Sequence, residues 1–208
     1  MKTYLPDEIE KESFKIISDE MEGTCIDDEK APILKRVIHA TADFEYVRNL
    51  TFSKSAVQNA IKVIKNGVDI VTDTQMVMAG INKAAALKSK TKIHCFISDE
   101  DVKKCSKERG VTRSSICMEK AVEIKKNVII AVGNAPTALI RLNELIKENK
   151  IKPILVIGVP VGFVNVVESK ELIMNSGVEY IVAKGRKGGS NVAAAIVNAL
   201  LYMTYPRG

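Results

Sequence analysis

The chain has 208 residues and a mass of 22.8 kDa, which is enough to bury a hydrophobic core without metal ions or disulfides. Its content of 46% hydrophobic and 27% charged residues, with 12 Gly and 6 Pro, excludes a collagen-like, disordered or low-complexity protein. The net charge of +6 favours an anionic partner, but scattered basic residues and the absence of Trp argue against a nucleic-acid-binding protein.

The first third of the chain is mainly helical in pattern. Apolar residues recur at helical spacing over residues 7–21, 31–41, 43–50 and 53–65, so we expect a helical N-terminal layer over about 7–66. No signal peptide precedes these segments, and the four cysteines show no C-x-x-C spacing. We therefore expect reduced thiols and a cytoplasmic location.

Five short apolar runs follow, each ending in turn residues, and each is typical of a buried strand: residues 69–72, 92–97, 128–132, 154–159 and 180–183. Helical patterns lie between them, for example over 135–149 and 164–176. Alternating strands and helices predict an α/β fold, a three-layer doubly wound sheet of about five parallel strands over about 68–205. No linker is evident, so we expect a single domain over 1–208.

The longest uncharged run, residues 188–206, is rich in alanine and contains Ser190, Asn191 and Asn198. This composition favours a buried helix over a transmembrane segment. We therefore expect no association with a membrane.

Glycine-rich segments at the predicted strand ends are candidate anion sites. Neither G-x-G-x-x-G nor the P-loop motif occurs, which leaves a nucleotide-binding enzyme as a weak alternative. Segments 133–137, 158–163 and 185–191 each follow a strand and are expected to open a helix, where free N–H groups can bind carboxylate or phosphate oxygens. Arg186 and Lys187 favour such a site. Ordinary turns capped by Asn134 and Ser190 explain the same pattern.

His39 is the more informative of the two histidines. Leu34, Val37 and Ile38 form an apolar stripe on the helix expected over 31–41, and His39 points almost opposite to it, one turn after Arg36. A histidine in this position is exposed to solvent unless a substrate or a partner chain covers it.

Three further polar features have both structural and functional interpretations. Ser13 faces the apolar stripe of its helix, where its hydroxyl either bonds to the preceding turn or contacts a ligand. Arg113 follows a predicted N-cap, Thr112, and a cation there opposes the helix dipole by about 0.3 to 1 kcal/mol, so it either binds an anion or extends into solvent. His94 and Cys95 are neighbours on a strand and point to opposite faces, so we expect no metal site.

The order and spacing of these segments resemble those of the precorrin-8X methylmutase family, including its cobalt-precorrin-8 branch, which acts in the corrin pathway to vitamin B12. The matching residues are 12–14, 36–40, Glu45, Arg48, 52–53, Asp73, 76–77, Gly80, 112–114, 133–138, 158–163, 168–170, 185–186 and 188–190. They extend from about residue 10 to residue 200.

The resemblance implies a homodimer that holds a corrinoid substrate near the subunit interface and moves a methyl group from C11 to C12 of the macrocycle. The family's catalytic histidine falls on His39, and substrate-binding positions fall on Ser13, Arg36 and Arg113. Arg186, Asn134 and Asp73 are weaker candidates. A methyl shift within a conjugated ring changes no oxidation state, so no cofactor and no metal ion of the protein's own are implied. A corrinoid carrier without catalytic activity is the main alternative.

Overall fold

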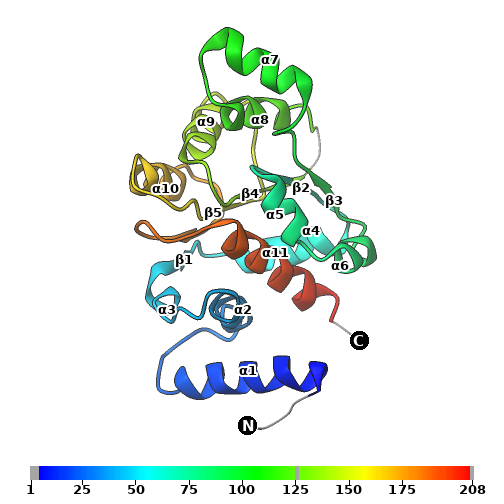
Figure 1. Ribbon diagram of the computed structural model, residues 1–208, viewed down its shortest axis with the longest axis vertical. Helices are drawn as coiled ribbons and strands as arrows, with labels where there is room; N and C mark the ends of the chain where they lie inside the picture. The colour runs from blue at the N-terminus through cyan, green and yellow to red at the C-terminus, as the bar shows by residue number, and fades with distance from the viewer. Residues whose placement is uncertain (1–4, 125–126, 207–208) are drawn as a thin grey trace.

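The computed structural model describes residues 5–124 and 127–206 and contains a six-stranded sheet with the order β1-β6-β5-β4-β2-β3 (Figure 1). The strands are β1 (Leu50–Phe52), β2 (Asp69–Thr72), β3 (Lys92–His94), β4 (Val128–Val132), β5 (Leu155–Gly158) and β6 (Tyr180–Ala183). Strands β2 to β6 are all parallel to one another, whereas the edge strand β1 is antiparallel to β6. The predicted α/β fold with five parallel strands is confirmed, and β1 is added at one edge.

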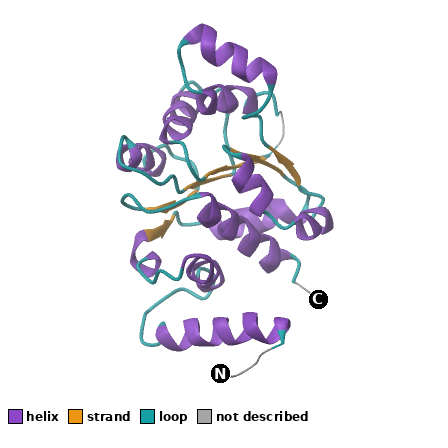
Figure 2. Cartoon of the chain, viewed as in Figure 1, coloured by secondary structure: helices purple, strands orange, loops and turns teal. Residues whose placement is uncertain are grey.

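Two helical layers enclose the sheet (Figure 2). One layer contains α2 (Ala31–Thr41), α4 (Ala56–Lys65), α5 (Gln75–Gly80), α6 (Lys83–Lys88) and α11 (Ser190–Thr204). The other contains α8 (Arg113–Ala121), α9 (Pro136–Lys147) and α10 (Val166–Met174), and α7 (Glu100–Arg109) packs on the outer side of α8. Helix α1 (Pro6–Glu20) packs on α2, outside the first layer, and α3 (Tyr46–Asn49) leads into β1 (Figure 1).

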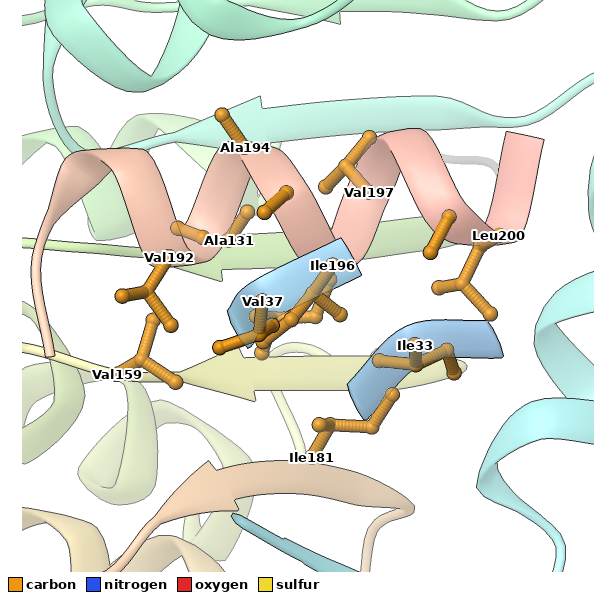
Figure 3. Packing of buried hydrophobic residues seen from close by; sticks show 14 of the residues in the cluster. Ile33, Val37, Ala131, Val159, Ile181, Val192, Ala194, Ile196, Val197 and Leu200 are labelled. Carbon is orange, nitrogen blue, oxygen red and sulfur yellow. The ribbon is translucent and has the colours of Figure 1, made fainter. Parts of the chain in front are cut away.

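The central strands are apolar throughout because both of their faces are covered. In β4, Ile129 and Ala131 belong to the core cluster on the α2 and α11 side, whereas Ile130 and Val132 belong to the cluster on the α8 and α9 side. Figure 3 shows Val192 and Ile196 of α11 packed close to the strands in the first cluster. Among the described residues, no helix is both long enough and apolar enough to cross a membrane.

The sequence-based prediction was wrong over residues 43–50. A helix was expected over the whole segment, but only α3 is helical. Leu50 to Phe52 form strand β1 instead, which pairs with β6 so that Leu50 lies opposite Ala183 and Phe52 opposite Ile181. The hydroxyl of Thr51 also donates to the backbone oxygen of Val182, at 2.9 Å. These partners lie more than a hundred residues away in the sequence, so no local pattern could indicate a strand of three residues. The strand expected over 92–97 is also shorter and ends at His94.

The ends of several helices meet at the carboxyl edge of the sheet. Helix α11 begins there, after β6, and the side-chain amide of Asn191 lies 3.4 Å from the backbone oxygen of Ala40 at the end of α2. The first turn of α8 is tied to that of α9 by a hydrogen bond of 2.8 Å between Thr112 and Thr137. The last turn of α2 and the first turn of α8 therefore both lie at the edge where ligands bind in doubly wound folds.

Candidate active site

The carboxyl edge of the sheet combines exposed apolar side chains with exposed cations. The large apolar side chains exposed in the loops and helix starts at this edge are Met76, Val111, Val161, Phe163 and Val164. Arg113 and Arg186 are exposed in the same region. Such a surface suits a ligand with a large apolar face and anionic groups at its rim.

His39 lies in the last turn of α2 and is exposed, as the sequence predicted. Its ring stacks on the ring of Phe14 from α1, with 5.1 Å between centroids and 9° between planes. The guanidinium carbon of Arg36 lies 4.5 Å from the centroid of the same Phe14 ring and 5.1 Å from that of Tyr202. Arg36 also forms a salt bridge with Glu10. Phe14 therefore contacts both the imidazole and the guanidinium, which restricts the orientation of His39.

Ser13 precedes Phe14 on α1 and is half-buried. Its hydroxyl donates to the backbone oxygen of Ile9 at 2.8 Å, which is the structural alternative that the sequence left open. The hydroxyl oxygen can still accept a hydrogen bond. The structure thus brings Arg36 and His39 together through the Phe14 ring, and Ser13 lies next to Phe14 on α1. Sequence reasoning did not identify Phe14 and Tyr202 as site residues.

Arg113 lies in the opposite layer, at the first position of α8. Thr112 caps this helix as predicted, because its hydroxyl oxygen accepts from the N–H of Ser115 at 3.2 Å. The guanidinium of Arg113 is exposed, lies 3.4 Å from the backbone oxygen of Ile97, and lines a cavity of about 500 Å³ beside α7. Because α2 and α8 pack on opposite faces of the sheet, Arg113 and His39 belong to different layers of the subunit.

The first of the three predicted anion sites is filled by the protein itself. Asp73, which is fully buried after β2, accepts hydrogen bonds from the N–H groups of Gly133, Asn134 and Ala135 at 2.9, 2.8 and 2.9 Å. Burial raises the pKa of Asp73 above its usual range, and the three N–H donors oppose this shift. Asp73 therefore fixes the loop after β4, and those N–H groups are not free to bind an external anion.

The other two segments also differ from expectation. Residues 158–163 do not open a helix directly, because α10 begins only after Asn165, whose backbone is left-handed. Segment 185–191 does open a helix, α11. The predicted capping side chains are not observed: Asn134 does not cap α9, and Ser190 does not cap α11. The Ser190 hydroxyl lies 3.1 Å from that of Thr74 instead.

Lys187 and Arg186 are adjacent but have different surroundings. The Lys187 ammonium lies 2.6 Å from the carboxylate of Asp43 and 3.0 Å from that of Glu45. The hydrogen bond to Asp43 raises the pKa of Lys187 and lowers that of Asp43. The guanidinium carbon of Arg186 instead lies 5.5 Å from the centroid of the exposed Phe163 ring. Arg186 is therefore the better candidate for contact with an anionic ligand.

Two further cavities lie in the described part of the chain, one at the opposite edge of the sheet and one beside the candidate site residue Arg36. The larger, about 560 Å³, is lined by residues at the start of β2 and β3, including Asp69 and Lys92, and so opens at the amino edge of the sheet. A second, of about 380 Å³, lies beside Arg36 and is lined by Phe14 and Tyr202. Within residues 5–124 and 127–206, no group of three or more His, Cys, Asp or Glu side chains could hold a metal ion.

The family model for precorrin-8X methylmutase matches residues 8–203. The chain belongs to the precorrin-8X methylmutase family. Members of this family are isomerases of cobalamin biosynthesis, so the resemblance seen in the sequence is confirmed.

Similar proteins cover nearly the whole chain. The chain is 46% identical to the cobalt-precorrin-8 methylmutase of Priestia megaterium, over 95% of this chain and 88% of that protein. It is 36% identical to the precorrin-8X methylmutase of Pseudomonas aeruginosa, over 92% and 93%. The crystal structure of precorrin-8X methylmutase from Thermus thermophilus superposes with a TM-score of 0.86 at 36% identity, over 94% of this chain and 96% of that one.

Proposed function

We propose that this methylmutase moves the methyl group at C11 of precorrin-8X or cobalt-precorrin-8 to C12, with His39 as the catalytic residue. The observation that carries the proposal is the stacking of the exposed His39 ring on Phe14, which presents an oriented imidazole at the carboxyl edge of the sheet. Relatives named for cobalt-precorrin-8 are 34% to 46% identical to this chain, and relatives named for precorrin-8X, at 34% and 36%, fall in the same range. Both forms are therefore carried as candidate substrates, to be separated by assay.

The reaction is an isomerisation, so one carbon–carbon bond breaks at C11, one forms at C12, and no atom is gained or lost. In the metal-free substrate, His39 holds or donates a proton at the nitrogen of the ring that loses its methyl group, which stabilises the product arrangement of double bonds. In the cobalt form the metal occupies that nitrogen, and His39 instead forms a hydrogen bond to the edge of the macrocycle.

The carboxylates at the rim of the corrinoid require cationic and hydrogen-bonding partners. Arg36, Arg113 and Arg186 can each form charge-assisted hydrogen bonds with a carboxylate, and Ser13 can act as an acceptor for a protonated group. The apolar side chains of the carboxyl edge, such as Phe163 and Met76, would pack against the flat macrocycle.

We also propose a homodimer with the substrate near the subunit interface. Two observations support it. Arg113 and His39 lie in different layers of one subunit, and the exposed apolar side chains include Leu5, Ile9 and Ile16 on or beside α1 as well as those at the carboxyl edge. Burial of such side chains against a second subunit would remove apolar surface from water. Sedimentation equilibrium tests the proposal, and a monomer at micromolar concentration in the presence of substrate would contradict it.

The remaining parts of the proposal concern the chain as a whole. Residues 1–208 act as one methylmutase domain, which is supported by a core cluster that includes both Ile17 of α1 and Leu201 of α11. The four cysteines are free thiols, which supports a reducing compartment such as the cytoplasm.

The decisive experiment measures turnover of both substrate forms by visible absorbance, with wild type and His39→Ala. We expect His39→Ala to bind the corrinoid but to lose about 10²-fold or more in kcat, the usual range for a lost proton donor or acceptor. His94→Ala is the matched control, because His94 is the other histidine and contacts Asp69 in the sheet instead of Phe14. Near-normal turnover by His39→Ala removes His39 from the mechanism. Binding without any conversion by the wild type favours the carrier alternative.

A further inference from the structure

Lys170 is a buried cation with no carboxylate partner among the described residues. It lies in the middle of α10 and is only 1% exposed. Its ammonium donates to the backbone oxygens of Gly185 and Lys187 at 2.7 and 2.8 Å. Burial lowers the pKa of Lys170 to about 8. A buried charge without a counter-ion destabilises a fold by several kcal/mol, so its presence calls for a reason beyond packing.

The two carbonyls that Lys170 holds belong to the residues on either side of Arg186. Lys170 therefore fixes, from the buried side, the backbone of the loop that carries the Arg186 side chain. Further contacts join this loop to the one after β5: the Gly162 N–H donates to the backbone oxygen of Arg186 at 3.2 Å, and the Gly189 N–H donates to that of Val159 at 2.8 Å.

The packing between these loops leaves little room for movement. A Cβ atom on Gly188 would lie 2.1 Å from the backbone oxygen of Val159, so only glycine fits there. On the outer side, the guanidinium of Arg186 lies over the Phe163 ring. The ammonium of Lys170 and the guanidinium of Arg186 thus act on opposite sides of one short, closely packed segment.

We infer that Lys170 is a positioning residue, which holds the Gly185–Lys187 backbone so that Arg186, stacked on Phe163, meets a carboxylate of the substrate. This inference rests on the proposed function, because it takes the ligand to be a polycarboxylate. Lys170 itself does not touch the substrate. Its two hydrogen bonds fix the backbone at residues 185 and 187, which leaves the Arg186 side chain fewer orientations to lose when the substrate binds.

A double-mutant cycle tests this role with Lys170→Met, Arg186→Met and the double variant. Each single change should raise KM about tenfold, which is the effect of losing or misplacing one charge-assisted hydrogen bond, with kcat within about twofold of the wild type. The double variant should be no worse than Arg186→Met. Lys120→Met is the control, since Lys120 lies in the α8 layer and pairs with Asp99 and Asp101.

A merely structural role gives a different pattern. The KM effects would then multiply in the double variant, to about 100-fold, as for independent sites. That result, or a KM for Lys170→Met within twofold of the wild type, would overturn the inference. Failure of the proposed function is a distinct result, because the wild type would then show no turnover at all. In that case the hydrogen-exchange measurement below still decides whether the loop that Lys170 holds contacts the corrinoid.

Hydrogen exchange on the wild-type protein provides a second measurement that does not depend on folding of a variant. Corrinoid binding should slow amide exchange in the peptide that covers residues 184–190 at least tenfold. A peptide from the amino edge, over residues 64–70, should be unaffected. Equal exchange of the 184–190 peptide with and without the bound corrinoid would show that this loop does not contact the substrate, and would overturn the inference.

Discussion

Replacement of Asp73 by asparagine should destabilise the protein through the loop after β4. One carboxylate oxygen of Asp73 accepts from Gly133, and the other accepts from Asn134 and Ala135. An asparagine side chain has only one oxygen, so it keeps at most two of the three bonds and turns an NH₂ group toward a third N–H donor. Loss of a hydrogen bond to a charged group costs about 1.5 to 3 kcal/mol, and the buried donor left unpaired adds to this.

We therefore expect Asp73→Asn to lower the free energy of unfolding by about 3 kcal/mol, with relief of the buried charge as the opposing effect. With a urea m-value of about 2 to 3 kcal/mol/M, the midpoint of unfolding followed by circular dichroism should fall by about 1 to 1.5 M. Asp101→Asn is the control, because Asp101 is exposed and its partner Lys120 retains Asp99. A midpoint for Asp73→Asn within 0.2 M of the wild type, at an unchanged m-value, would refute the reasoning.

Three other changes test separate parts of the structure. Gly188→Ala places a Cβ against the backbone of Val159, so we expect a loss of about 2 to 3 kcal/mol in unfolding free energy, and a stability equal to wild type would contradict the packing described. Arg113→Ala should weaken corrinoid binding about tenfold at low salt and reduce the salt dependence of Kd, and unchanged affinity would reject this role. Lys170 has a pKa of about 8 in the folded state against an ordinary 10.5, so the unfolded chain binds more protons between these values and stability should rise with pH there. Relative to Lys170→Met, the wild type should gain up to about 3 kcal/mol from pH 8 to pH 10.5, and a constant difference in urea unfolding would contradict the assignment.

The sequence was informative wherever a structural element depends on its own residues. Central strands such as β4 need apolar side chains on both faces, and that requirement appears as a continuous apolar run. The stripe of Leu34, Val37 and Ile38 fixed the outward direction of His39 because helical geometry is local. The cap of α8 at Thr112 was predicted for the same reason. The matched motifs then indicated the methylmutase family, which the comparisons with known proteins confirmed.

Contacts between distant segments required the tertiary structure. The pairing of β1 with β6 and the ring of Phe14 on His39 each join residues of different elements. The same is true of the bonds from Asp73 to the loop after β4 and from Lys170 to the loop after β6. A carboxylate or an ammonium in a sequence shows what kind of partner it needs, but many N–H and C=O groups could serve. Which of them lies within about 3 Å is decided only when the layers pack together, because hydrogen bonds require both proximity and alignment.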